Sequence, residues 1–208
     1  MKRRSLLTIA AASVPAMAGC SGVAPVSETT PSPTPKPMTP FEASEHPEVN
    51  EVVGYELAIH RRTNRAREQH GVGTVSYDPQ IAYISRRYSQ KMANMDSVEH
   101  NIDGKSTTER LNKYGILCTD ISENLSLRGI NEEYTASTSP EILADSSVTG
   151  WLNSDEGHRE NLLDDEWEYE GVGVYVTADA KVYVTQTFTA RDCDGPGDPP
   201  RYDGEYDG

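Results

Sequence analysis

The first half of the chain carries apolar side chains at helical spacing. The clearest series steps by three or four residues, which places its members on one buried helix face: Ile81, Ile84, Tyr88, Met92 and Met95. Asp78-Pro79 precedes this series, and Asp at the N-cap with Pro in the first turn is a typical helix start. The pattern therefore predicts an amphipathic helix that begins at residue 79.

Three further segments have helical patterns. Residues 50–70 form the first, with Gly71 as its stop and a predicted inner face of Val49, Val53, Leu57, His60 and Asn64. Residues 107–114 form a short second one that Gly115 closes. Ser139-Pro140 opens the last, whose predicted inward residues are Ala144, Val148, Trp151 and Leu152.

The end of the chain alternates between apolar and polar residues instead. The valines at 172, 174 and 176 and at 182 and 184 flank residues 178–180, a pattern that predicts a β-hairpin. Residues 121–127 are a plausible third strand. Helices come first and the sheet comes late, so the fold class is α+β, with helices covering a small antiparallel sheet. We place this domain at residues 44–192 and expect residues 193–208 to form a disordered acidic tail.

The first twenty residues are typical of an export signal. A basic start at Lys2-Arg3-Arg4 precedes an apolar stretch that is too short to span a bilayer, and the arginine pair resembles a twin-arginine signal. The segment Met17-Ala18-Gly19-Cys20 resembles a lipobox, although Met17 stands where Leu or Val is usual. We expect cleavage and lipidation at Cys20; the alternative is a plain cleaved signal with an incidental cysteine.

Residues 21–43 are rich in Pro, Ser and Thr and have no apolar face to bury, so they predict an extended tether. An anchor followed by a tether predicts an extracellular lipoprotein held at the outer face of the cytoplasmic membrane. The membrane, reached through Cys20, is then the first predicted partner.

The charge balance excludes one function class. Asp and Glu number 33 against 19 Lys and Arg, for a formal net charge of −14. Nucleic-acid binding needs a basic surface, so we expect no nucleic-acid partner. A strongly acidic chain is suited to high ionic strength, where salt screens its self-repulsion. We therefore expect a halophilic, archaeal source; the alternative is an ordinary acidic secreted protein.

Three segments, in this order and spacing, resemble the CAP superfamily of cysteine-rich secretory, antigen 5 and pathogenesis-related proteins. The first is Thr63-Asn64-Arg65-Ala66-Arg67 with Tyr77-Asp78-Pro79, and the second is residues 95–100 with Ser122-Glu123-Asn124-Leu125. The third runs from Trp151 through Gly157-His158-Arg159 and Asn161-Leu162-Leu163 to the hairpin. The likeness is strongest to prokaryotic members, which have short loops and few cysteines.

The resemblance implies an α-β-α sandwich with a central cleft that two His and two acidic residues line in animal and plant members. His100 matches the first His, Glu123 the first acid and His158 the second His, whereas Ser154 stands at the place of the second acid. Asp155 or Glu156 could substitute for that acid.

Two imidazoles and a carboxylate could hold zinc with an open coordination position, or could orient a water molecule without a metal. The alternative is structural: Glu123 bonds backbone amides, His158 caps a helix and His100 is an ordinary loop histidine. Zinc is therefore the one cofactor that we consider.

Two cysteines remain after Cys20. Cys118 and Cys193 allow one intramolecular disulfide, and the alternative is two free thiols. Asn124 begins a formal glycosylation sequon, which we expect to be buried and unmodified because it lies on the predicted third strand.

Two functions from different classes follow. The first is a non-enzymatic surface module that binds a lipid, an envelope component or a protein, as the resemblance implies. The second is an extracellular, peptidase-like hydrolase that uses His100, Glu123 and His158, with or without zinc. The sequence contains no nucleophile-elbow, P-loop or paired Cys-x-x-Cys motif that would favour another enzyme class.

The net charge of −14 generates the first prediction. Because salt screens repulsion among exposed carboxylates, the melting temperature of the chain should be higher in molar NaCl than in low salt. Thermal unfolding followed by circular dichroism at both salt concentrations checks this, and greater stability in low salt would contradict a halophilic origin.

Overall fold

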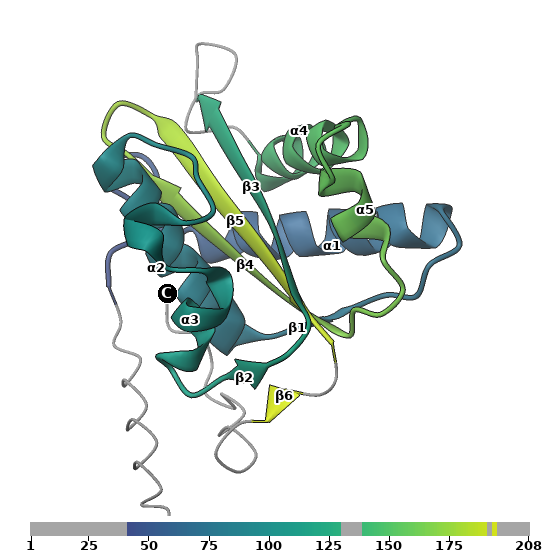
Figure 1. Cartoon of the computed structure of the whole chain (residues 1–208). Coiled ribbons are helices and arrows are strands. Elements are labelled where there is room, and N and C mark those ends of the chain that lie inside the picture. The colour runs from purple at the N-terminus through teal and green to yellow at the C-terminus, as the bar shows by residue number, and fades with distance from the viewer. Residues whose placement is uncertain (1–40, 130–138, 191–192, 195–208) are drawn as a thin grey trace, which may run out of the picture. The chain divides into compact units, whose positions relative to one another are not determined.

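The computed structural model describes residues 41–129, 139–190 and 193–194, which form a sheet between two helical layers (Figure 1). The helices are α1 (Val53–Gln69), α2 (Pro79–Met95), α3 (Thr107–Asn112), α4 (Pro140–Leu152) and α5 (His158–Leu163), with a short 3-10 turn η1 (Ile102–Gly104). The strands are β1 (Ser76–Tyr77), β2 (Leu117–Cys118), β3 (Ile121–Gly129), β4 (Tyr169–Val176), β5 (Lys181–Thr189) and β6 (Cys193–Asp194).

The main sheet has the strand order β1-β4-β5-β3. β4 and β5 form the predicted hairpin, and β3 pairs antiparallel with β5 over its whole length. The short edge strand β1, which the sequence analysis missed, pairs with β4 in parallel. The α+β class and the α-β-α sandwich are therefore confirmed, in a sheet that is antiparallel apart from β1. β3 lies at the other edge of the sheet.

One face of the sheet is an apolar core. The five valines of the hairpin are almost completely buried and pack with Trp151 and Leu162 from α4 and α5 and with Ile59 from α1. The periodicity in the α4 segment located Ala144, Val148 and Trp151 correctly, and only Leu152 stays partly exposed. Burial of these aliphatic and aromatic side chains is the main stabilising term of this layer.

The other face lies close to the backbone of α2. Gly171 and Gly173 of β4 leave no room for a Cβ, because a methyl group there would overlap the main chain of α2. The hydroxyl group of Ser89 donates to the carbonyl of Gly173 (2.8 Å) and lies 2.8 Å from the Thr185 hydroxyl. Small and hydroxyl side chains thus join helix to sheet where larger ones would separate them.

The inner face of α1 differs from the predicted one. Val53, Leu57, His60 and Asn64 are only partly buried, whereas the fully buried positions include Glu56, Thr63 and Arg67. Glu56 accepts hydrogen bonds from the Arg86 Nε (2.7 Å) and the backbone amide of Val174 (3.0 Å). A search for apolar spacing cannot identify these positions, because the residues are charged and their burial depends on partners from other elements.

Arg67 is the second buried charge of α1. Its guanidinium donates to the carbonyl oxygens of Gly73 (2.7 Å), Leu162 (2.8 Å) and Asp164 (2.9 Å). It therefore joins the end of α1 to the end of α5. On α2 the predicted face is buried from Ile81 to Met92, but Met95 is 57% exposed because the helix ends at this residue.

The two domain cysteines meet in a small separate sheet. β2 and β6 pair antiparallel and set Cys118 directly opposite Cys193. Cys118 is buried and disulfide-bonded. Cys193 as its partner stays a prediction, which this register favours. The export signal, Cys20 and most of the tether and of the acidic tail lie outside the described residues.

The close approach of α2 to β4 generates a prediction. Gly173→Ala should lower the free energy of unfolding by about 3 kcal/mol, because the added methyl group overlaps the Arg86 backbone and forces helix and sheet apart. Urea denaturation measures this loss. The matched control is Gly54→Ala near the start of α1, where the new methyl group has its nearest neighbour 3.8 Å away and should change stability by less than about 1 kcal/mol. Equal effects of the two substitutions would contradict the packing account.

Candidate functional site

The predicted site residues lie around the free edge strand β3. Glu123 and Asn124 are consecutive in this strand, so their side chains leave opposite faces of the sheet. Glu123 points to the α2 and α3 side, where His100 also lies, and Asn124 contacts α5, where His158 lies. The edge of β3 is thus the common support of both histidines.

Glu123 is the best-buried charge of this site. Its side chain is only 3% exposed, and both carboxylate oxygens have charged or polar partners. Oε1 lies 3.0 Å from Nδ1 of His100, and Oε2 accepts a hydrogen bond from Nη2 of Arg110. A buried carboxylate needs such compensation, and the Arg110 guanidinium provides it as a permanent cation.

Arg110 also fixes the loop that carries His100. Its Nη1 donates to the carbonyl oxygens of His100 (2.8 Å) and Lys105 (3.1 Å), and its Nη2 donates to the Thr107 hydroxyl (2.9 Å) as well as to Glu123. The guanidinium carbon lies 3.4 Å from the ring centroid of Tyr88, a favourable cation-π geometry. One side chain from α3 therefore organises the surroundings of His100.

His158 has a different environment at the start of α5. Its Nδ1 lies 2.9 Å from the hydroxyl oxygen of Ser154, and that oxygen accepts a hydrogen bond from the backbone amide of Glu156 (3.1 Å). Burial lowers the pKa of His158 below its ordinary value, and the nearby His100 lowers that pKa further, while Glu156 acts in the opposite direction. His158 therefore favours its neutral form.

A buried amide network ties α5 to the sheet. The Asn124 side-chain amide is fully buried and donates to the His158 carbonyl and to the Gln186 side chain, each at 3.1 Å. Asn161 donates to the Asn124 side chain (3.0 Å) and to the Glu123 carbonyl (3.3 Å). The sequon residue is thus structural, as expected, and holds the His158 backbone against β3.

The same network continues across the sheet to α1. Gln186 donates to Glu170 (2.5 Å) and to Thr63 (2.8 Å), and the other carboxylate oxygen of Glu170 lies 2.7 Å from Nδ1 of His60. His60, one of the residues of the predicted inner face, is therefore a partly buried partner of a buried acid. These contacts join β4 and β5 to α1.

The structure brings the sequence-predicted residues together in two pairs: His100 with Glu123, and Ser154 with His158. Asp155 and Glu156 are exposed, and the contact between Glu156 and Ser154 uses the Glu156 backbone amide. Sequence reasoning missed Arg110. It lies in the predicted short helix, where an arginine on a helix surface carries no signal of its own.

A metal ion does not fit these residues well. Zinc needs free lone pairs from three or more ligands, yet both Glu123 oxygens already have partners, one of them a cation. Across residues 41–129 and 139–190, no three His, Cys, Asp or Glu side chains gather as a metal-ligand group.

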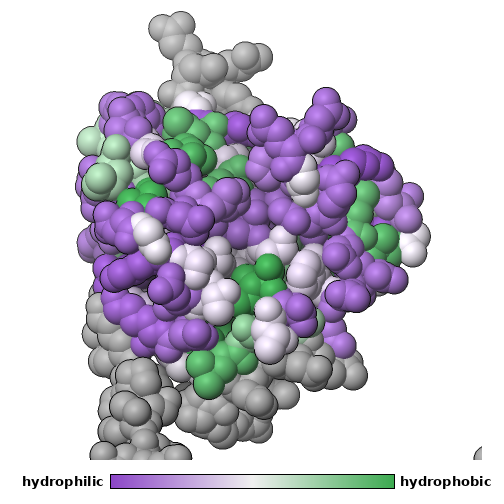
Figure 2. All heavy atoms as spheres, viewed as in Figure 1, coloured by the Kyte–Doolittle hydropathy of each residue, from purple (hydrophilic) through white to green (hydrophobic). Residues whose placement is uncertain are grey.

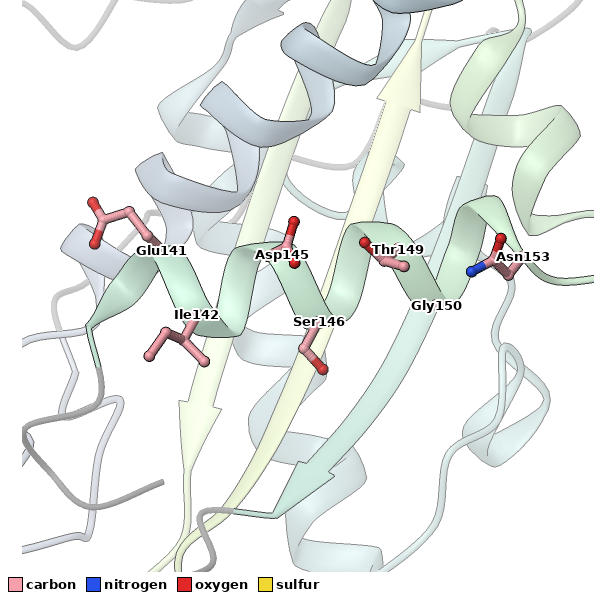
Figure 3. Close-up of a pocket in the computed structure, with 7 residues that line it drawn as sticks. All are labelled: Glu141, Ile142, Asp145, Ser146, Thr149, Gly150 and Asn153. Atoms are coloured by element: carbon pink, nitrogen blue, oxygen red, sulfur yellow. The ribbon is translucent and has the colours of Figure 1, made fainter. Parts of the chain in front are cut away.

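A shallow hollow elsewhere on the surface is a poorer candidate. Its lining comes from α4 and the residue that follows it, and Figure 3 shows the side chains in a row along this helix: Glu141, Ile142, Asp145, Ser146, Thr149, Gly150 and Asn153. A row on one helix has no converging polar groups from a second element, unlike the residues that meet at β3, α3 and α5.

None of the described helices is long and apolar enough to span a membrane.

The environment of His158 generates a pH prediction. Because the pKa of His158 is lower in the folded state than its ordinary value of about 6.5, the unfolded chain binds more protons just below that pH. This residue therefore makes the free energy of unfolding rise with pH through that window. NMR titration of the ring measures the pKa directly: His100→Ala should raise it, and Glu156→Gln should lower it. Shifts in the same direction would contradict the assigned causes.

Comparisons with known proteins agree with this architecture. The profile of CAP, the cysteine-rich secretory protein family, matches residues 60–188. An uncharacterized membrane protein of Bacillus subtilis, YlbC, is 32% identical over 132 residues, which are 62% of this chain and 32% of that protein. This chain thus spans about a third of the length of that relative.

Solved structures give the same fold. An extracellular SCP-domain protein from Bacillus anthracis aligns with a TM-score of 0.52 and 26% identity over 67% of this chain and 41% of its own. An outer surface protein from Borrelia burgdorferi aligns with a TM-score of 0.56 and 19% identity over 68% of this chain and 96% of its own. The profile match covers more than half of the sequence and includes β3, His100 and His158, so the chain belongs to the CAP family of cysteine-rich secretory proteins.

Proposed function

We propose that this chain is a surface-displayed CAP module that binds a lipid, an envelope component or a protein, and that its cleft recognises a ligand without transforming it. The observation that carries the proposal is the state of Glu123. Its carboxylate is buried, and each of its oxygens already has a partner from the protein, Nδ1 of His100 or Nη2 of Arg110, so it is not exposed to a substrate. A general base needs the opposite: an accessible lone pair beside the substrate.

The proposal includes export and anchoring. The lipobox-like segment at Cys20 and the tether at residues 21–43 support a lipid-anchored protein at the outer face of the cytoplasmic membrane. Two proteins of similar structure, an extracellular protein of Bacillus anthracis and an outer surface protein of Borrelia burgdorferi, are consistent with such a location.

A hydrolase is the second candidate, and the pair of Ser154 and His158 favours it. A hydroxyl 2.9 Å from an imidazole is the contact that activates a serine nucleophile. However, the Ser154 oxygen already accepts the Glu156 amide, and among the described residues no carboxylate hydrogen-bonds to His158. A catalytic serine pair needs a third group that orients the base, so recognition is the stronger interpretation.

The test is binding to isolated cell envelopes by the full chain carrying Cys20→Ala, which removes the anchor and leaves the domain unchanged. Saturable co-sedimentation is expected, and His158→Ala should weaken it at least tenfold, a loss of about 1.4 kcal/mol in binding free energy. His46→Ala is the matched control, because residues 43–45 contact Val176 on β4, which lies on the side of β5 away from β3.

The hydrolase interpretation predicts a different result. Turnover of a peptide substrate that is lost in both Ser154→Ala and His158→Ala, with unchanged melting temperatures, would overturn the binding module. Equal loss of envelope binding in His158→Ala and His46→Ala would show that the cleft is not the binding site.

A further inference from the structure

We propose that side chains from α4, α5 and β3 itself cover the outer edge of β3, and that this cover prevents the chain from pairing edge to edge with a second copy of itself. An uncovered edge strand presents N–H and C=O groups that any other strand can bind. The anchor proposed at Cys20 would concentrate copies of the chain at one membrane, where an open edge is a hazard. The cover depends only on contacts within the domain and is independent of the proposed function.

The hydrogen bonds between β3 and β5 show which backbone groups of β3 point outwards. Among the described strands β3 pairs with β5 alone, in antiparallel register over nine residues. Directly before β3, the Asp120 carbonyl accepts a hydrogen bond from the Ala190 amide (3.4 Å), so the even-numbered residues face β5. The N–H and C=O groups of Glu123, Leu125 and Leu127 therefore point away from β5.

Two of these three carbonyl oxygens accept hydrogen bonds from the neighbouring helices. Nδ2 of Asn161 in α5 donates to the Glu123 oxygen (3.3 Å), and Nε1 of Trp151 in α4 donates to the Leu125 oxygen (2.9 Å). Figure 1 shows both helices beside β3. The Trp151 side chain is almost completely buried in the core, so the position of its indole N–H is fixed.

Arg128 covers the third carbonyl. Its Nη1 donates to the Leu127 oxygen (3.0 Å), and its Nη2 donates to the Ser146 carbonyl of α4 (3.3 Å). A Cβ at position 150 of α4 would lie 2.5 Å from this Nη2, so the guanidinium occupies space that Gly150 leaves open. Glycine inside a helix costs up to about 1 kcal/mol relative to alanine, and room for the guanidinium gives a reason for it here.

An added strand would have to displace all three side chains. Strand addition uses the outward carbonyl of every second residue as an acceptor. In β3 these acceptors already have donors from residue 123 to residue 127. The edge is thus closed by hydrogen bonds as well as by the bulk of the two helices.

The opposite edge of the sheet is covered as well. β1 pairs with the first residues of β4, and the Glu56 carboxylate accepts the Val174 amide (3.0 Å). Residues 43–45 form backbone hydrogen bonds with Val176 at the end of the strand. Groups of the same chain therefore cover both edge strands, which supports edge protection as a general property of this domain.

The surface around β3 offers little for an association by apolar burial. The face that carries α2, α3, β3 and α5 is mostly hydrophilic, with small separate apolar patches (Figure 2). In the described part of the chain, the large exposed apolar side chains are distributed over several segments: Met95, Val98, Leu117, Leu127 and Ile142. Large contiguous apolar patches mark protein interfaces, so backbone pairing along β3 is the route that remains for this face. A strand can pair antiparallel with its own copy about a twofold axis, so the occupant of an opened edge is a second copy.

Sedimentation velocity of the full chain with Cys20→Ala, which removes the lipidation site, tests the cover. This parent chain should be a monomer from micromolar to submillimolar concentration. Trp151→Phe combined with Arg128→Ala keeps an aromatic ring in the core but uncovers the carbonyls of Leu125 and Leu127. This opened variant should form a dimer whose population rises with concentration in the same range.

Two further variants assign the dimer to β3. Trp167→Phe is the matched control, because it also removes an indole hydrogen bond, 2.8 Å long, but to the Asn161 carbonyl of α5. It should stay monomeric. Leu127→Pro, added to the opened variant, should restore the monomer, since the amide of residue 127 points away from β5 and its loss leaves the ladder with β5 intact.

Three results would overturn the proposal. These are a folded opened variant that stays monomeric, a dimer that Leu127→Pro does not abolish, and a parent chain that itself dimerises and loses the dimer with Leu127→Pro. If Trp151→Phe unfolds the chain at the temperature of the assay, Arg128→Ala with Asn161→Ala uncovers the same edge without changing the apolar core. The same outcomes then decide.

Discussion

The buried charge of Glu123 is the constraint on which the candidate site depends. It lies on β3, which pairs with β5 alone among the described strands, and its carboxylate is withdrawn from water. A charge in that position requires a counter-ion, and Arg110 of α3 supplies it while also bonding the loop carbonyls at His100 and Lys105. A single ion pair thus closes the loop onto the sheet and positions His100.

The two histidines of the candidate site are positioned by different chemistry. On the α3 side a charged pair stacked on Tyr88 does the positioning, whereas on the α5 side uncharged amides from Asn124 and Asn161 hold the His158 backbone. Removing one partner of a buried ion pair leaves an uncompensated charge and costs several kcal/mol, while amide hydrogen bonds contribute about 1 kcal/mol each. The His100 side therefore depends on a single ion pair, and the His158 side depends on several smaller bonds.

Much of the fold follows from periodicity. Predictions of the helix after Asp78, of the hairpin and of the strand at residues 121–127 are confirmed because each buries a regular apolar or alternating face. The inner face of α1 was predicted wrongly, since Glu56 and Arg67 are buried and only their partners on other elements explain why. β1, β2 and β6 are two residues long each, too short to leave a pattern.

The residues of the site likewise divide into those that the sequence predicts and those that it does not. The family resemblance pointed to His100, Glu123 and His158, and the contact between the first two is present. Neither Arg110 nor the bond between Ser154 and His158 could be predicted, because each depends on how separate segments meet in space. Ser154 stands where the resemblance places an acid, and in this chain its hydroxyl oxygen lies 2.9 Å from Nδ1 of His158.

A double-mutant cycle on Arg110 and Glu123 tests the account most directly. Urea unfolding of the parent chain, Arg110→Met, Glu123→Gln and the double variant gives the coupling energy of the pair. We predict a large loss of stability in Arg110→Met, much of it recovered in the double variant, with a coupling of about 3 kcal/mol. Strictly additive effects would mean that Glu123 does not depend on Arg110, and this would contradict the ion pair as the organising contact of the cleft.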